Sequence, residues 1–313
     1  MTEKQKSVHT ALCQRGFLPA GAENYQKFKD FQADNLLYEM SVSLTVTWSG
    51  IFNTLYRIID GFFCTVCFYR DGEISFCVRR PKAPHDLRHI VDTLYNLSAE
   101  AGLSSLLIWA VEERFLPEYR NIEGYDMKAD YSDTMSEYVY TTADLLELRG
   151  EVNYYKRKRL KEFLNKPNVS VRDITKENVR VCLDIEDVWC GCQDCPLCES
   201  FAGCSKKTLK IMTEIFDGTR YQGILCDVDG VPAGYAIWEK ASDNLAYMHF
   251  AKAGIPNLNT YLYYIVTQNY LSSVTQINNG ADLGKQGLRI FKKGLGKHTL
   301  WRKYLCEFTA KKG

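Results

Sequence analysis

Residues 221–239 read YQGILCDVDGVPAGYAIWE. Two runs rich in β-branched, aliphatic and aromatic residues, Tyr221–Val228 and Val231–Glu239, are joined by the turn sequence DVDG. An Asp-Gly pair between two such runs is a strong signal for a tight turn between antiparallel strands. The stretch therefore predicts a β-hairpin, around which the second half of the chain is organised.

The segments on either side of this hairpin predict a mixed domain of helices and strands. The expected helices are Asn178–Trp189, Lys206–Phe216, Asn259–Leu271 and Gln286–Lys293, and the further strands are Leu245–Lys252, Ser273–Ile277 and His298–Phe308. The order helix, helix, hairpin, strand, helix, strand, helix, strand resembles that of a GNAT-type N-acyltransferase domain.

The first half of the chain has a similar pattern. The expected strands are 41–48, Phe62–Tyr69, Glu73–Arg79, 104–111 and one near Tyr125, with a helix over 86–101 and a short helix before Tyr125. A length of 313 residues suits two domains of about 150 residues each. The sequence thus predicts an α/β (α+β) protein made of tandem GNAT-like domains, residues 1–145 and 146–313. One long helix within the segment 144–168 is expected to join them and to end before Pro167.

Two stretches carry a resemblance to a known family. Residues 137–163 read EYVYTTADLLELRGEVNYYKRKRLKEF, and residues 278–304 read NNGADLGKQGLRIFKKGLGKHTLWRKY. Together they resemble bacterial proteins grouped with the C-terminal domain of phosphatidylglycerol lysyltransferase. The segment GLRIFKKGLG also resembles GLYRFKKGFG of the Fem peptidyltransferases. The resemblance implies an acyltransferase that takes an aminoacyl group from aminoacyl-tRNA and passes it to a lipid or amine acceptor.

The chain departs from the family pattern at two carboxylates. The family segment H-x-E-K-A here reads His249-Phe250-Ala251-Lys252-Ala253, and N-x-E-x-D-L-G reads NNGADLG over 278–284. The glutamate is absent from both segments, which indicates an altered substrate or mechanism. The family residues that remain in the second motif are Asp282, Gly284, Gly287, Arg289 and Lys292.

The motifs supply candidate site residues of two kinds. Attack of an amine on an ester needs a proton acceptor, an oxyanion stabiliser and positioning of two large substrates. The catalytic candidates are Asp282 for the proton, Lys292 for the oxyanion by resemblance to the Fem segment, Arg289 and Lys252. The substrate-binding candidates are Lys156, Arg157, Lys158, Arg159, His249, Lys285 and Lys293. The alternative for the acidic and guanidinium groups is structural: Asp282 caps the following helix and Arg289 pairs with a carboxylate.

A glycine-rich loop for the pyrophosphate of acyl-CoA is not evident. Such a loop presents backbone N–H groups at a helix N-terminus. The corresponding connection in the second domain reads AKAGIPNLN over 251–259, with one glycine and a proline that removes a donor. The first domain offers WAVEERFLPEY over 109–119 and nothing better. Acyl-CoA is therefore disfavoured as the donor.

Charge is concentrated locally. The net charge of the chain is +1, yet residues 281–313 hold nine Lys or Arg and two Asp or Glu. The helix expected over 144–168 adds the run Lys156, Arg157, Lys158 and Arg159. Two basic elements on a neutral protein indicate a local polyanion site, for which tRNA and an anionic lipid headgroup are the expected partners. A solvated connecting helix is the alternative.

Five of the twelve cysteines lie between the two helices that precede the hairpin. They are Cys190, Cys192, Cys195, Cys198 and Cys204. Close spacing of thiols in a reduced compartment can close a tetrahedral zinc site or hold an Fe–S cluster. Free thiols and a redox-sensing loop are the alternatives. Under each of these alternatives, residues 190–204 are expected to be an insertion into the second domain.

Localisation follows from what the sequence lacks. No stretch approaches 18 uncharged apolar residues, and the first residues contain no apolar core of the kind a signal peptide needs. We therefore expect no transmembrane segment and a cytoplasmic protein. Two rival functions stay open at this point: a non-catalytic binding protein that keeps the fold and its basic groove, and a metal- or redox-responsive regulator.

Overall fold

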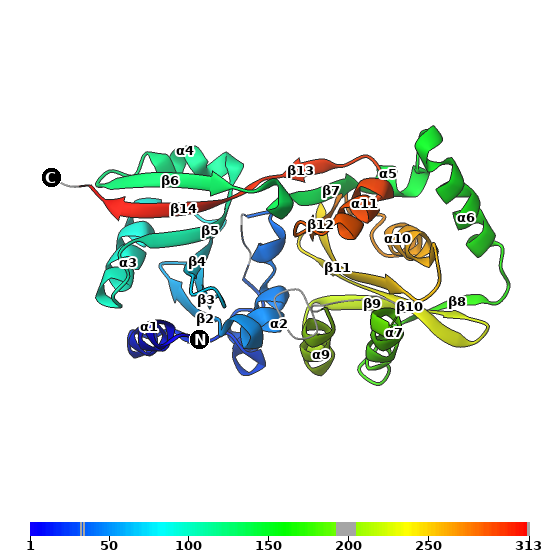
Figure 1. Cartoon of the computed structure of the whole chain (residues 1–313), viewed down its shortest axis with the longest axis horizontal. Helices are drawn as coiled ribbons and strands as arrows, with labels where there is room; N and C mark the ends of the chain where they lie inside the picture. Colours follow the sequence, from blue (N-terminus) through cyan, green and yellow to red (C-terminus); the bar gives the residue numbers. More distant parts are fainter. Residues whose placement is uncertain (32, 34, 192–204, 312–313) are drawn as a thin grey trace. The chain divides into compact units, whose positions relative to one another are not determined.

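The computed structural model describes residues 1–31, 33, 35–191 and 205–311 (Figure 1). The chain forms two compact units, Met1–Ser136 with Trp301–Gly313, and Glu137–Leu300. Each unit contains a mixed seven-stranded sheet with helices packed on it. The predicted α/β class with tandem GNAT-like halves is confirmed.

The first unit has the strand order β1-β2-β3-β4-β5-β14-β6. Strands β4 and β5 are parallel and are linked by α3, whereas the other pairings in this sheet are antiparallel. The core lies between this sheet and α1 and α3 and includes Leu12, Phe76 and Leu94. The elements are α1 (Glu3–Gln14), β1 (Leu18–Pro19), η1 (Ala22–Lys27), η2 (Tyr38–Met40), α2 (Val42–Phe52), β2 (Leu55–Ile59), β3 (Phe62–Phe68), β4 (Ile74–Arg79), α3 (Leu87–Glu100), β5 (Leu106–Glu112), η3 (Glu113–Phe115), α4 (Leu116–Arg120), β6 (Tyr125–Tyr131), η4 (Asp133–Met135) and β14 (Lys303–Ala310).

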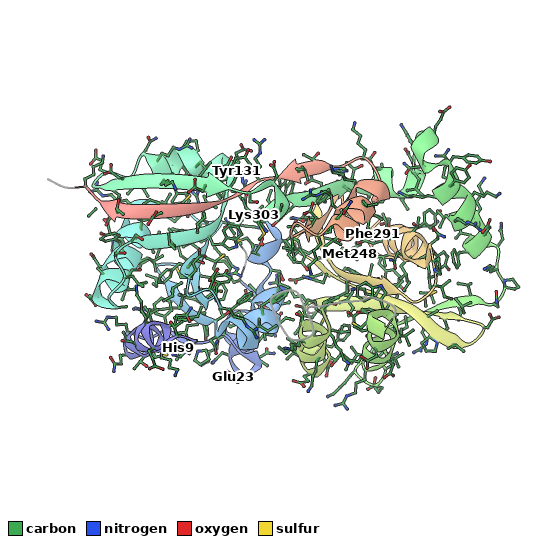
Figure 2. All side chains as sticks on the ribbon, viewed as in Figure 1. His9, Glu23, Tyr131, Met248, Phe291 and Lys303 are labelled. Atoms are coloured by element: carbon green, nitrogen blue, oxygen red, sulfur yellow. The ribbon has the colours of Figure 1, made fainter. Side chains whose placement is uncertain are left out.

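The second unit has the strand order β13-β7-β12-β11-β10-β9-β8. Helices α7 and α9 pack on one face of this sheet, and α10 with α5 and α6 packs on the other (Figure 1). Met248 and Phe291 belong to the cluster on the α10 side (Figure 2). The elements are β7 (Glu137–Thr141), α5 (Thr142–Glu147), η5 (Glu151–Asn153), α6 (Tyr154–Leu164), β8 (Val169–Asp173), α7 (Val181–Gly191), α9 (Ser205–Ile215), β9 (Tyr221–Val228), β10 (Val231–Lys240), β11 (Leu245–Ala253), α10 (Leu258–Asn269), β12 (Gln276–Ala281), α11 (Gln286–Leu295) and β13 (Thr299–Trp301).

The hairpin at 221–239 forms as predicted. Val228 pairs with Val231, so the turn consists of Asp229 and Gly230 alone. Their φ angles are 55° and 77°, the left-handed values that a two-residue turn between antiparallel strands requires. Glycine accepts such a backbone at no steric cost, and aspartate tolerates it better than most residues.

The predicted domain boundary at 145/146 differs from the division in the structure. Strand β7 starts at Glu137 and already belongs to the second sheet, where it pairs with β12. The single strand predicted over His298–Phe308 is two strands, β13 in the second sheet and β14 in the first. Strand β14 lies between β5 and β6 and pairs with both. The first unit is therefore completed by a segment, Trp301–Gly313, that lies far from the rest of it in sequence.

The prediction of one long helix over 144–168 is also wrong, because two separate helices, α5 and α6, lie there. Helix α5 ends at Glu147, Leu148 has the left-handed φ of 45°, and Gly150 has a φ of 89°. The Arg157 side chain of α6 donates to the carbonyls of Leu148 and Gly150, which fixes the break between the two helices. The basic run is thus confined to the 11-residue helix α6.

Residues 41–48 form the start of α2 and not the predicted strand. Ser41 caps the helix by accepting the N–H of Leu44 at 3.0 Å. The hydroxyls of Thr45 and Thr47 donate to carbonyls one turn earlier, at 3.1 and 3.0 Å. This local bonding satisfies the threonine hydroxyls inside a buried helix, so their β propensity does not decide the structure.

The parallel strand pair locates the connection that corresponds to a CoA-binding loop. In the second unit β11 and β12 are parallel and α10 joins them, so that connection is Gly254–Asn257, as expected. In the first unit β4, α3 and β5 have these roles, so the connection is 80–86 and not 109–119. Residues 80–86 read RPKAPHD, with two prolines and no glycine.

None of the helices in the described part of the chain combines the length and the apolar character that a membrane span needs.

Candidate functional site

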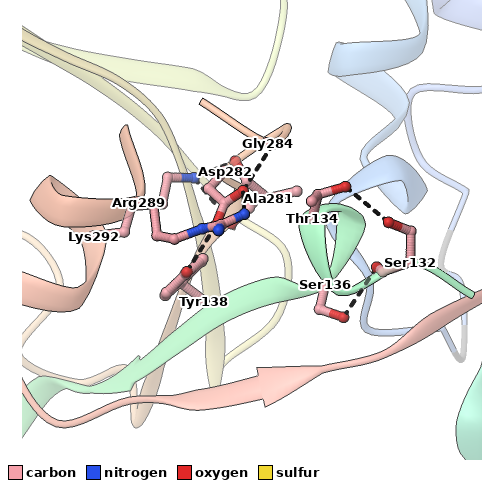
Figure 3. Close-up of polar contacts among 10 residues, drawn as sticks. Ser132, Thr134, Ser136, Tyr138, Ala281, Asp282, Gly284, Arg289 and Lys292 are labelled. Atoms are coloured by element: carbon pink, nitrogen blue, oxygen red, sulfur yellow. Dashed lines mark hydrogen bonds and ion pairs between the residues drawn. The ribbon is translucent and has the colours of Figure 1, made fainter. Parts of the chain in front are cut away.

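Asp282 and Arg289 form the centre of the motif that follows β12. The Asp282 carboxylate accepts two hydrogen bonds from the Arg289 guanidinium, at 2.8 Å from Nε and 3.2 Å from the second terminal nitrogen (Figure 3). It also accepts the Tyr138 hydroxyl at 2.9 Å and the Gly284 N–H at 2.8 Å. The Arg289 bonds, more than any other contact, hold the pKa of Asp282 below its usual value. Asp282 is therefore an ionised anchor for Arg289.

The loop between β12 and α11 has the backbone shape that this anchoring needs. Leu283 and Gly284 have φ angles of 55° and 73°. Two consecutive left-handed residues turn the chain back so that the Gly284 N–H reaches the Asp282 carboxylate. A left-handed leucine is costly and is retained where surrounding structure demands it. The loop thus stores strain directly beside the Asp282–Arg289 pair.

Lys292 is buried and its ammonium is fully engaged. Its Nζ donates to the carbonyl oxygens of Asn279, of Gly280 at 2.9 Å and of Ala281 at 2.7 Å. An ammonium group has three N–H donors. All three are directed at the last residues of β12, so the oxyanion role predicted for Lys292 has no donor left to perform it. In this geometry Lys292 fastens α11 to the end of β12.

A second polar cluster surrounds Lys252 on β11. The Lys252 Nζ lies 3.3 Å from the centre of the Trp189 ring and 3.6 Å from the Glu186 carboxylate. Glu186 is fully buried and also accepts the Tyr235 hydroxyl at 2.8 Å and the Ser205 hydroxyl. Burial lowers the pKa of Lys252, and Glu186 opposes this less strongly. The cluster therefore holds a lysine that loses its proton more readily than a solvated one.

Lys285 connects the two clusters. It is the N-cap residue of α11, and its charge contributes to the lowered pKa of Lys252 after the effect of burial. Lys293 is exposed in the last turn of the same helix. Four of the candidates, Lys252, Asp282, Lys285 and Arg289, thus belong to one region of the second unit.

His249 lies apart from that region's polar groups. Its side chain is buried, with Nε2 3.4 Å from the Glu239 carboxylate and its ring edge-on to Tyr221. The pairing of β11 with β10 shifts register at His249, between the Met248–Trp238 and Phe250–Ile237 pairs. Phe250 packs on the α7 and α9 side, whereas Ala251 and Ala253 pack against the cluster on the α10 side. A glutamate in place of Ala251 would point away from Lys252, so the buried Glu186 does not replace it in position.

The four consecutive basic residues of α6, Lys156 to Arg159, divide into two pairs. The Arg157 side chain donates to the Gly150 carbonyl in the break that precedes the helix. The Lys156 ammonium lies against Gly294, 2.9 Å from the position that a Cβ atom on this glycine would occupy. Burial lowers the pKa of Lys156. Lys158 and Arg159 are exposed. Of these four, the second pair is the one placed to contact a large anionic ligand.

The cysteine loop lies mostly outside the described residues. Cys192, Cys195, Cys198 and Cys204 are not described, and Cys190 sits half-buried near the end of α7. Among the residues that are described, no group of three or more potential ligands could hold a metal ion.

Four residues of these clusters are not among the site candidates that the sequence supplies. They are Tyr138, Glu186, Trp189 and Tyr235. Tyr138 and Tyr140 alternate in β7 and so share a face, which was a usable signal. Tyr140 donates to the Lys292 carbonyl at 2.7 Å from that face. The α7 residues gave no comparable signal, because a glutamate in a helix is ordinarily solvated.

Solved structures resemble this chain over nearly its whole length. A conserved protein of unknown function from Bacteroides thetaiotaomicron matches with a TM-score of 0.83 at 20% identity, covering 94% of this chain and 99% of the other. L-PGS from Bacillus licheniformis matches with a TM-score of 0.62 at 12% identity, covering 93% and 92%. FemX matches with a TM-score of 0.60 at 12% identity, covering 90% and 94%. These likenesses establish a shared fold.

Comparison by sequence is more specific. No curated protein matches the chain. The family model described as phosphatidylglycerol lysyltransferase, C-terminal, matches residues 34–303. That range contains the first motif, the second motif apart from its last residue, and every described site candidate, from Lys156 to Lys293. The chain belongs to the phosphatidylglycerol lysyltransferase C-terminal family.

Proposed function

We propose that this protein transfers an aminoacyl group from aminoacyl-tRNA to a lipid or amine acceptor. In the reaction, a nitrogen or oxygen of the acceptor attacks the ester carbonyl and forms a new amide or ester bond. The ester bond to the tRNA ribose breaks, the attacking group loses a proton and the ribose hydroxyl gains one. Family membership and the fold shared with L-PGS and FemX support this reaction class.

The observation that carries the proposal is the way Arg289 is held. Asp282 binds one edge of the guanidinium, and the Arg289 side chain remains 40% exposed. Asp282 binds Nε and one terminal nitrogen, so the other terminal nitrogen is not engaged by that carboxylate. An arginine fixed by one edge offers preorganised donors on the other, which suits a phosphate or the oxyanion of an ester under attack.

We assign to Lys252 the role of the general base that accepts the proton of the attacking group. A general base must be neutral in part near the working pH, and burial moves the pKa of Lys252 in that direction. Glu186 is placed to stabilise the ammonium that forms when Lys252 accepts a proton. Asp282 does not suit this role, because its lowered pKa makes it a weak base.

Exposed basic residues support binding of the tRNA. Lys293 on α11 and Lys158 and Arg159 on α6 are exposed cations of the second unit. Phosphate contacts of this kind position a nucleic acid without reading its sequence. The anionic headgroup of a lipid acceptor would also be attracted to them.

The test is transfer from a pool of charged tRNAs, labelled in the amino acid, in the presence of a lipid and amine extract. The proposal expects accelerated loss of the aminoacyl ester with a new labelled product. An Arg289→Gln variant should be folded and inactive, and a Lys4→Gln variant should be active because Lys4 is an exposed cation of the first unit, outside the two basic elements. Binding of charged tRNA without any turnover would instead favour a non-catalytic binding protein.

A further inference from the structure

Helix α6 begins with two exposed aromatic side chains. Tyr154 and Tyr155 are 56% and 76% exposed. Their rings lie 5.4 Å apart at an angle of 78°. The helix is attached to its unit by other residues, since Leu160 and Phe163 are the ones it buries. The tyrosines therefore contribute little to the fold, although each could bury a large apolar area.

The same exposed side of α6 is cationic. Residues 154–166 contain six basic residues and one acidic residue, Glu162, which pairs with Arg159 at 2.7 Å. Tyr154, Lys158 and Lys161 follow one another at helical spacing of four and three, so they lie along one stripe. Lys158 and Lys161 are exposed, and neither forms an ion pair within the described part of the chain.

Exposed aromatics beside unpaired cations match one class of ligand. Single-stranded nucleic acids bind where bases stack on aromatic rings and basic residues follow the backbone. A duplex offers phosphates but no free base to stack. A membrane surface is less suitable, because interfacial helices bury a broad apolar face, and Leu164 is the sole large aliphatic residue exposed on α6 as described.

We infer that Tyr154 and Tyr155 form a stacking platform for unpaired bases of RNA, with Lys158 and Lys161 contacting the adjoining phosphates. This inference rests on the proposed function for the source of the RNA, which is the unpaired acceptor end of a charged tRNA. Binding to the platform is measurable without any transfer reaction.

The experiment measures binding of a fluorescein-labelled single-stranded RNA octamer and of the same strand in a duplex, by anisotropy. A Tyr154→Ala/Tyr155→Ala variant should bind the single strand about ten-fold more weakly and the duplex unchanged, because stacking on one base is worth on the order of a ten-fold effect. A Tyr154→Phe/Tyr155→Phe variant keeps both rings and should bind both RNAs like the parent protein. Thermal unfolding should be the same for all three proteins.

A second variant separates stacking from charge. Lys158→Gln/Lys161→Gln should weaken binding of the single strand and the duplex together and should flatten the dependence of affinity on salt. Unchanged single-strand affinity in the alanine variant overturns the platform. So does tyrosine-dependent binding to phosphatidylglycerol vesicles with no tyrosine-dependent RNA binding. If RNA binding needs the tyrosines but no transfer occurs, the proposed function fails and the platform stands.

Discussion

The Asp282 carboxylate holds the Arg289 guanidinium through two hydrogen bonds, 2.8 and 3.2 Å long, across seven positions of chain. Tyr138 from β7 and the Gly284 N–H fill the remaining acceptor positions of the carboxylate. A guanidinium fixed in this way has a defined direction, and its free edge is presented to solvent. The pair therefore joins the fold of the β12–α11 loop to the chemistry proposed for it.

Replacing Asp282 by Asn should misplace Arg289. Asparagine offers one carbonyl oxygen and no charge, so the bidentate pair is lost. We expect single-turnover transfer to fall by about 10- to 100-fold, because positioning of a catalytic donor has effects of this order. Tyr138→Phe removes one neutral donor and should cause a smaller loss. If Asp282→Asn transfers at the parental rate, Arg289 does not depend on this anchor.

Asp282 should also stabilise the protein in a pH-dependent way. Its folded pKa is depressed, chiefly by Arg289, below the value of about 3.9 expected for an unfolded chain. Its contribution is therefore complete above that unfolded value and is lost as the pH falls through the folded pKa. Urea unfolding between pH 3 and 7 should show a shallower acid loss for Asp282→Asn than for the parent protein. Asp130→Asn, at an exposed ion pair, is the matched control.

If Lys252 is the general base, the transfer rate plotted against pH should have a rising limb whose position depends on the pKa of Lys252. The rate should rise with pH as Lys252 loses its proton. Glu186→Gln removes the negative charge that raises the pKa of Lys252, so the limb should move to lower pH. Lys285→Gln removes a positive charge that lowers this pKa, so the limb should move to higher pH. The Cys190 thiol also acts on Lys252 and must stay unmodified in all variants. A limb that moves in neither variant would remove Lys252 from the proposal.

Lys292 should matter for stability before it matters for catalysis. Lys292→Met keeps most of the buried stem but leaves the carbonyls of Asn279, Gly280 and Ala281 without their donor. Leaving buried polar groups unpaired costs about 1–3 kcal/mol each, so a loss of several kcal/mol in the free energy of unfolding is expected. Denaturant unfolding measures it. An unfolding free energy within about 0.5 kcal/mol of the parent would contradict the fastening role.

The elements predicted correctly are those with strong local signals. Asp229-Gly230 fixed the central hairpin because its left-handed angles suit these residues. The helix over 86–101 was evident from its apolar spacing and is capped by Asp86, whose side chain accepts the His89 N–H. In both cases the local sequence and the tertiary packing favour the same structure.

The errors arise where distant segments decide. The last strand is divided between two sheets because β14 is inserted between β5 and β6, an arrangement that no local pattern encodes. The start of α2 has β-branched residues that suit a strand, yet the Ser41 cap and buried threonine bonds stabilise a helix.

The sequence points to three residues of the candidate site but not to all of their contacts. Asp282, Arg289 and Lys292 come from one motif, 278–304, which also supplies most of their partners, and Tyr138 on β7 is the partner from outside it. Arg289 pairing with a carboxylate was anticipated as a structural alternative, and that carboxylate is Asp282 itself. The complete use of the Lys292 donors depends on how α11 lies against β12. Glu186 acquires its significance only from burial beside Lys252.

Single-turnover decay of the aminoacyl ester on charged tRNA is the most direct test, with the parent protein, Arg289→Lys and Lys4→Gln compared at equal folding stability. Lysine keeps the charge but not the planar fork that Asp282 orients. The account predicts that Arg289→Lys slows transfer to the labelled product by at least about 100-fold, the scale of losing one oriented oxyanion donor. Lys4→Gln should match the parent. Equal ester decay in all three proteins, or none in the parent, would contradict the claim that this site performs aminoacyl transfer.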